Sequence, residues 1–178
     1  MKMTYRILLF LGLFLWTGFL AQAQTATLSV TVTGAIHQSF TFQTGVVSRQ
    51  LIAYQAVPPE HTLGFFTDRN ENIPFYFAGV LADLQQPVAA GDFPMLPVVN
   101  DMPELSTATL KGALLTLKIN NPGIARPEEY ISIPGTGNQI HIQDISSSEI
   151  KGTFSSQMQS VSDASRQIQV SGSFVLSR

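Results

Sequence analysis

The sequence predicts an all-β, antiparallel fold, and three observations support this prediction. Apolar and polar residues alternate with a period of two in several segments after residue 24, which is typical of strands with one buried face. The periodicity of an amphipathic helix is hard to find in the same region. Proline, glycine and asparagine separate the alternating segments, as they do in turns. We therefore expect a β-sandwich or a barrel-like meander.

The first strands are expected at 27–33, 36–42 and 46–54. The segment 27–33 alternates most regularly, with leucine and valine on one side and serine and threonine on the other, so one face should be solvated. Gly34 should end it. Pro58-Pro59 closes this part of the chain, because proline cannot donate to a β-ladder.

The next strands are expected at 62–67, 73–81 and 110–119. Along 73–81 both faces are apolar, with Phe75 and Phe77 on one and Tyr76, Ala78 and Val80 on the other. Such a strand is expected to be covered on both sides, which favours a sandwich or a barrel over a single open sheet. Segment 110–119 has one apolar face, formed by Ala113, Leu115, Leu117 and Ile119.

Two hairpins are expected in the last third of the chain. Strands at 130–133 and 139–145 flank Gly135-Thr136-Gly137-Asn138, a sequence typical of a hairpin turn. The final hairpin joins 149–158 to 166–176 through the five-residue loop 161–165.

The register of the final hairpin follows from its glycines, because each strand carries one glycine on its apolar face. An antiparallel register that places Phe154 opposite Gly172 also places Phe174 opposite Gly152. A phenylalanine that covers a cross-strand glycine is known to fix register. The same register pairs Ile150 with Leu176, and Met158 with Ile168.

The segment 82–109 interrupts the strand pattern. Pro87, Pro94, Pro97 and Pro103 exclude a regular central strand, and long connections without secondary structure are uncommon in compact domains. One interpretation is a crossover that fills an open end of the core. The other is a ligand or partner surface made by its apolar residues, which are Phe93, Met95, Leu96, Val98, Val99 and Met102.

The N-terminus has the features of a secretory signal peptide. Lys2 and Arg6 precede an uncharged apolar run, and Ala21-Gln22-Ala23 fits the A-x-A cleavage pattern. Cleavage before Gln24 is expected, which leaves a single β domain of residues 24–178. The apolar run is shorter than a membrane span, so no stable membrane anchor is expected after cleavage. The protein should be exported to the periplasm or out of the cell.

The composition excludes several classes of protein. After cleavage, 8 of the 10 basic residues remain against 12 acidic ones, and the basic residues are scattered singly, so a nucleic-acid partner is not expected. The absence of cysteine excludes disulfides, thiolate metal sites and a lipid-modified cysteine. Charged residues make up only 12% of the chain, so the surface must consist of serine, threonine, glutamine and asparagine.

No catalytic or metal-binding pattern is complete. His37, His61 and His141 are not at metal-ligand spacing, and His141 is expected on a solvated strand face. Segment 68–72 begins like a calcium loop but lacks the glycine and glutamate that such a loop needs. Glu128 and Glu129 should point apart, as neighbours on an extended chain do. We therefore predict neither an enzyme nor a cofactor or metal site.

The closing stretch, with Gly152-Thr153-Phe154 and Gly172-Ser173-Phe174, resembles the terminal hairpin of small exported bacterial β proteins whose role is uncharacterised. The resemblance covers about a sixth of the chain. It implies a β fold and an exported bacterial protein, and it transfers no functional residue.

Three functional hypotheses remain. The first is a non-catalytic interaction module that binds a protein or a glycan. The second is a lipocalin-like carrier of a small apolar ligand, with a cavity lined by Phe65, Phe66, Phe75 and Phe77. The third is a hydrolase whose site is assembled from distant residues.

Overall fold

A computed structural model describes residues 26–43, 46–49, 58–67, 75–99, 102–106, 108–120 and 127–177. The predicted signal peptide, the segment 68–72 and the end of the strand expected at 46–54 lie outside these residues. The described elements are β1 (Thr27–Gly34), β2 (Gln38–Phe42), β3 (Val46–Arg49), a 3-10 turn (Pro59–His61), β4 (Thr62–Thr67), β5 (Phe75–Asp83), β6 (Gly91–Pro94), β7 (Val98–Val99), β8 (Met102–Pro103), β9 (Lys111–Ile119), β10 (Glu128–Ser132), β11 (Gln139–Ile145), β12 (Glu149–Ser160) and β13 (Gln167–Ser177).

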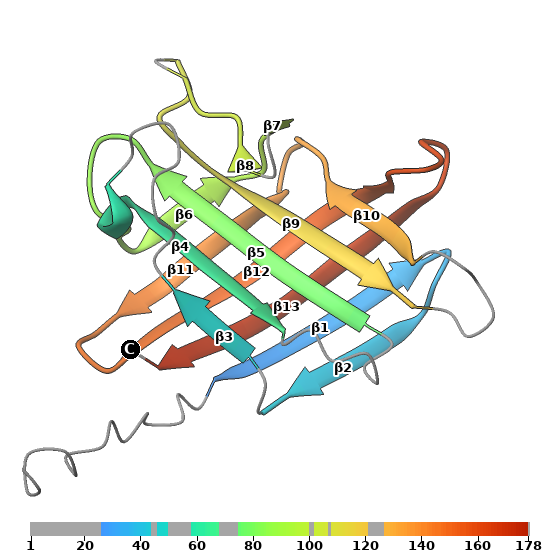
Figure 1. The fold of residues 1–178 in the computed structure, drawn as a ribbon, viewed down its shortest axis with the longest axis horizontal. Coiled ribbons are helices and arrows are strands. Elements are labelled where there is room, and N and C mark those ends of the chain that lie inside the picture. Colours follow the sequence, from blue (N-terminus) through green and yellow to red (C-terminus); the bar gives the residue numbers. More distant parts are fainter. Residues whose placement is uncertain are drawn as a thin grey trace, which may run out of the picture.

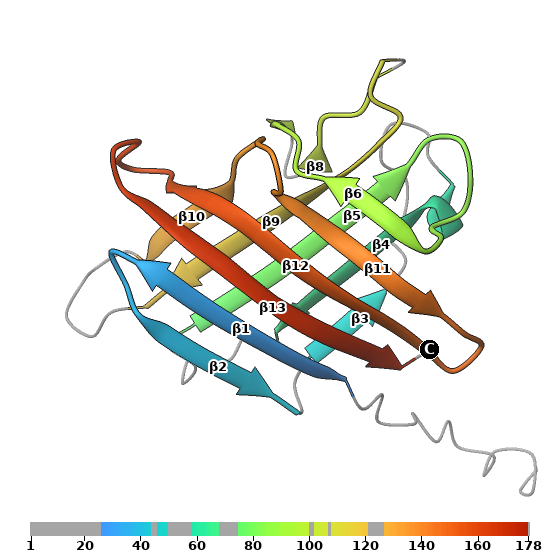
Figure 2. The same ribbon diagram turned by 180° about the vertical axis from the view of Figure 1, so that it is seen from behind.

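Eleven of the described strands form one antiparallel sheet that curls into a half-barrel, and β7 and β8 form a separate two-stranded sheet. The strand order is β2-β1-β13-β12-β10-β9-β5-β4-β3, and β11 and β6 form a branch from β12. Figure 1 shows β3, β4, β5 and β9 in front of β1, β12 and β13, and Figure 2 shows the same two halves from behind. The predicted all-β class is therefore confirmed, and a single curled sheet takes the place of two separate sheets.

The early strands agree closely with their alternation. β1 buries Leu28, Val30 and Val32, and β4 has the bounds expected from the sequence. Gly34 ends β1 with φ of 106°, a conformation that favours glycine. The prediction that both faces of β5 are covered fails for its middle, because Tyr76, Ala78 and Val80 are only half-buried there. The outer face of the sheet is partly solvated at this point.

The final hairpin has the predicted register. β12 and β13 pair Gly152 with Phe174 and Phe154 with Gly172. Ile150 faces Leu176 and Met158 faces Ile168. The backbone N–H of Ser160 donates to the Arg166 carbonyl at 3.0 Å, which leaves residues 161–165 as the loop. The two phenylalanine rings lie over the opposite glycines, where a Cβ would overlap them.

The hairpin predicted around Gly135–Asn138 is wrong. β10 and β11 do not pair with each other, since both pair with β12: Tyr130 faces Ser160 and Ile140 faces Phe154. β10 and β11 lie one after the other along the same edge of β12, and residues 133–138 connect them at the point where the sheet branches. Asn138 stabilises this excursion, because its side chain donates to the Ile133 carbonyl at 2.9 Å and accepts from the Gln157 N–H at 3.1 Å.

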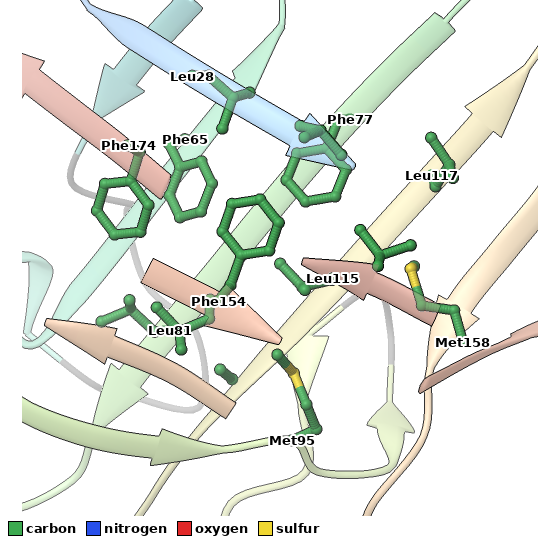
Figure 3. Close-up of a cluster of buried hydrophobic side chains, with 14 of the residues drawn as sticks. Leu28, Phe65, Phe77, Leu81, Met95, Leu115, Leu117, Phe154, Met158 and Phe174 are labelled. Atoms are coloured by element: carbon green, nitrogen blue, oxygen red, sulfur yellow. The ribbon is translucent and has the colours of Figure 1, made fainter. Parts of the chain in front are cut away.

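The core is an aromatic cluster between the two halves of the half-barrel. The ring of Phe65 on β4 stacks on Phe174 of β13, with 4.4 Å between centroids. Phe77 of β5 lies 5.0 Å from Phe154 of β12, and Phe75 lies 3.9 Å from Phe40 of β2. Figure 3 shows Phe65, Phe77, Phe154 and Phe174 gathered among leucine and methionine side chains. These ring contacts hold the two halves of the sheet together.

The crossover 82–109 contributes buried side chains to the core. It contributes the short strand β6, which pairs with β11 at the end of the branch. Phe93 and Met95 enter the main core, whereas Leu96 joins Ala82 and Leu105 in a second cluster. Leu96 packs against Gly112, where a Cβ would overlap its side chain. The crossover thus adds side chains to both clusters.

Candidate binding surfaces

The crossover residues singled out in the sequence do not form one exposed surface. Phe93, Met95 and Leu96 are buried, with 1%, 2% and 9% of their surface exposed. Val98 is half-buried, and β7, which contains Val98 and Val99, pairs with β8, which begins at Met102. The side chains of Val99 and Met102 lie outside the described part. Phe93, Met95 and Leu96 therefore belong to the hydrophobic core.

The three histidines lie in different parts of the structure. His37 is exposed beside β2, and the Nδ1 atom of His61 lies 3.0 Å from the Asp83 carbonyl. His141 lies on the outer face, as expected, and its Nδ1 is 2.6 Å from Oδ1 of Asp92. Within the described ranges, no group of three His, Cys, Asp or Glu residues is placed to hold a metal ion.

The adjacent glutamates have separate partners. Glu129 forms an ion pair with Lys118 at 3.0 Å. Glu128 pairs with Arg166 and accepts a hydrogen bond of 2.7 Å from the hydroxyl of Tyr130. The two carboxylates thus bind different cations, and both contacts lie at the beginning of β10. Burial raises the pKa of Tyr130 to about 12, and its bond to Glu128 acts in the same direction.

This raised pKa predicts a late phenol ionisation. The folded-state pKa of Tyr130 exceeds the ordinary value of 10.0, so the neutral phenol adds to the free energy of unfolding. This contribution is complete below pH 10 and is lost as the pH rises towards 12. Absorbance at 295 nm should show one tyrosine that ionises late in the folded protein. In Tyr130→Phe this late step should be missing. Ionisation of every phenol near pH 10 in the folded protein would contradict the assignment.

The aromatic residues proposed to line a lipocalin-like cavity have other partners. Phe65, Phe75 and Phe77 are at most 2% exposed and contact rings of the opposite half of the sheet or each other. Phe66 points to the other face of β4 and is half-buried. The three buried rings therefore pack into the core.

A large part of the outer surface carries hydroxyl and amide groups without charge. It is formed by the outward side chains of β1, β2, β13 and most of β12, and we call it the polar face. β1, β2 and β13 contain no charged residue, and β12 has only Glu149 and Lys151, at its beginning. The polar residues of this face are Thr27, Ser29, Thr31, Thr33, Ser39, Thr41, Thr153, Ser155, Gln157, Gln159, Gln167, Gln169, Ser171 and Ser173. The apolar Val175 of β13 lies on the same face, opposite Thr27.

Strand register arranges these groups in rows across the sheet. Ser29 lies between Thr41 and Ser173, and Ser173 faces Thr153 on β12. Thr31 lies in a parallel row that continues through β13 to β12. Neighbouring strands are about 4.8 Å apart, so each row presents hydroxyls at short, regular intervals.

Several of these side chains bind one another across the strands. The Ser39 hydroxyl donates to Thr31 at 3.4 Å, and the Gln169 amide donates to Ser155 at 3.1 Å. The Gln157 amide donates to Gln167 at 2.6 Å. These bonds order the side chains of the polar face.

A second surface feature lies where the crossover meets the sheet. The stems 83–86 and 108–111 line an open hollow of about 420 Å³. Its lining residues are Asp83, Gln85, Gln86, Ala108, Thr109, Leu110 and Lys111. Sequence reasoning missed this site because no spacing motif connects its two stems; only the strand pairing brings them together.

No family model, curated protein sequence or solved structure matches this chain. In the part of the chain that the structure describes, no helix has the length and apolar character needed to cross a membrane.

Proposed function

We propose that this protein is an exported, non-catalytic binding module whose polar face contacts a neutral glycan. The observation that carries the proposal is the absence of charged residues from β1, β2 and β13. Charged residues usually make up about 25% of a soluble domain. A charged partner would lose water on such a face and gain no counter-charge. A neutral, hydroxyl-bearing partner meets no such penalty.

The chemistry of the polar face supports a glycan in particular. Hydroxyls and amides both donate and accept hydrogen bonds, as sugar hydroxyls do. Serine and threonine are short, so ordering them costs less rotamer entropy than ordering lysine or glutamate. The cross-strand bonds of Thr31 and Ser155 reduce this cost further. We expect each contact to be weak and affinity to grow with the length of the glycan chain.

The interior supports the carrier hypothesis less well. The rings of Phe65, Phe75 and Phe77, which such a cavity would need as its lining, are engaged in packing. The proposed function therefore places the ligand outside the half-barrel.

Co-sedimentation with insoluble neutral polysaccharides tests this proposal. Cellulose, chitin and starch serve as probes, and we expect at least one to retain the protein at both low and high salt, because charge screening should not matter. Ser171→Arg places a bulky charge in the middle of the polar face and should lower the bound fraction about tenfold or more.

Ala164→Arg is the matched control, because Ala164 is exposed in the loop between β12 and β13 and the substitution adds the same charge. It should bind like the wild type. Failure of all three probes, binding that salt abolishes, or equal binding by both variants would contradict the proposal.

A further inference from the structure

The hollow at the base of the crossover lies at one end of the half-barrel, outside the aromatic core. Asp83 ends β5, Lys111 begins β9, and the two are partners in the last position of the β5–β9 ladder. Asp83 lies on the same face of β5 as the buried Leu81, and Lys111 lies on the same face of β9 as the buried Ala113. Both residues are therefore on the inner face of the sheet. The stems are fixed by a hydrogen bond of 2.7 Å from the Leu84 N–H to the Leu110 carbonyl. Mouths of β-barrels are common ligand sites.

Asp83 is an unusual residue for such a place, because its carboxylate is nearly buried. Only 4% of the residue is exposed. Its Oδ1 accepts a hydrogen bond of 2.9 Å from the Gln85 N–H, and it forms no ion pair with any described residue. Burial of a charge without an ionic partner is costly. Asp83 is one of the residues that line the hollow, so a cationic ligand bound there would lie beside it.

Lys111 supplies the opposite charge in the same hollow. Its ammonium lies 5.1 Å from the centroid of the Phe93 ring, a cation–π contact that restrains the long side chain. No described carboxylate forms an ion pair with it. The remaining lining residues are the polar Gln85, Gln86 and Thr109 and the apolar Ala108 and Leu110.

We propose that this hollow binds a small zwitterion, such as a free α-amino acid. The ammonium of the ligand would contact the Asp83 carboxylate, and its carboxylate would contact the Lys111 ammonium. The amides of Gln85 and Gln86 offer donors and acceptors to the remainder. A volume of about 420 Å³ lies within the range of roughly 300–1,000 Å³ that is usual for ligand pockets. This site is independent of the polar face.

Isothermal titration with free L-amino acids tests the proposal. We expect at least one of them to bind, whereas the same amino acid with an acetylated nitrogen and an amidated carboxyl should not. Asp83→Asn preserves the shape and the bond from Gln85, and should weaken binding about tenfold or more, because a hydrogen bond to a charged group is stronger than one to a neutral group. Lys111→Met should have a similar effect.

The matched controls are Asp92→Asn and Lys118→Met, which remove exposed or half-exposed charges elsewhere on the sheet. Both should bind like the wild type. If Asp83→Asn fails to fold, the comparison of free and blocked amino acids on the wild type still decides the question. Absence of binding by every free amino acid, equal binding of the blocked form, or binding of glucose alone would overturn the proposal. None of these results bears on polysaccharide binding at the polar face.

Discussion

Phe65→Ala should lower the free energy of unfolding by about 3–5 kcal/mol. Phe65 is fully buried on β4, and its ring contacts Phe174 and Phe154, which belong to the opposite half of the sheet. Its removal leaves a cavity where the two halves meet. Because a domain of this size is usually stable by about 5–15 kcal/mol, the loss is a large fraction of the total. Urea denaturation followed by circular dichroism measures it.

Phe66→Ala is the matched control, because Phe66 is the next residue on the same strand and points to the other, half-buried face. The same atoms are removed, but a solvent-accessible position can refill with water. We expect a clearly smaller loss of stability. Equal losses for the two variants would mean that the ring contacts between the two halves contribute little.

Gly172→Ala should also destabilise the protein strongly, by about 3 kcal/mol, at the upper end of the usual cost of overpacking. A Cβ at this position would overlap both the backbone carbonyl oxygen of Ser29 and the ring of Phe154. The backbone of β1 cannot move away without breaking its ladder with β13. Thermal unfolding of the variant measures the effect, and Ser171→Ala, on the outer face of the same strand, should change stability little.

A double variant separates the two overlaps. Phe154→Leu in the Gly172→Ala background removes the ring but leaves the Ser29 carbonyl in place. The added methyl group of Gly172→Ala should therefore remain destabilising when Phe154→Leu is also present. If the double variant were as stable as Phe154→Leu alone, the close approach of β1 to β13 at Gly172 would be refuted.

The sequence was sufficient to predict those features that depend on local pattern. Alternation located β1, because this strand has one face that must be buried and one that meets water. The register of the last hairpin could be derived from Gly152 and Gly172, because only one pairing covers both glycines with phenylalanine. In these cases the residues that decide the structure lie on the same strand or on adjacent strands.

The sequence was insufficient where a segment had a choice of partners. Gly135–Asn138 looked like a hairpin turn, yet β10 and β11 both pair with β12, and the side chain of Asn138 compensates for the backbone bonds lost between them. The crossover gave a similar ambiguity. Its apolar residues are compatible both with a buried core and with an exposed surface. The structure shows that Leu96, for example, packs against Gly112.

The candidate sites follow the same distinction. A low charge content predicted a surface of serine, threonine and glutamine, but strand order was needed to show that these residues gather on β1, β13 and their neighbours. The hollow depended even more on topology. Asp83 and Lys111 are separated by the whole crossover and become neighbours only through the last pair of the β5–β9 ladder.

Mapping of a neutral oligosaccharide by NMR tests the central claim, that the partner binds the polar face, most directly. A ¹⁵N-labelled sample would be titrated with a hexasaccharide of whichever polysaccharide retains the protein. We predict shifts of the amide signals of Ser29, Thr153 and Ser171 and little change at Phe65 and Phe77. A disaccharide of the same polysaccharide, titrated in the same way, should cause smaller shifts than the hexasaccharide. Shifts confined to the core aromatic residues, or to residues outside β1, β2, β12 and β13, would contradict the account.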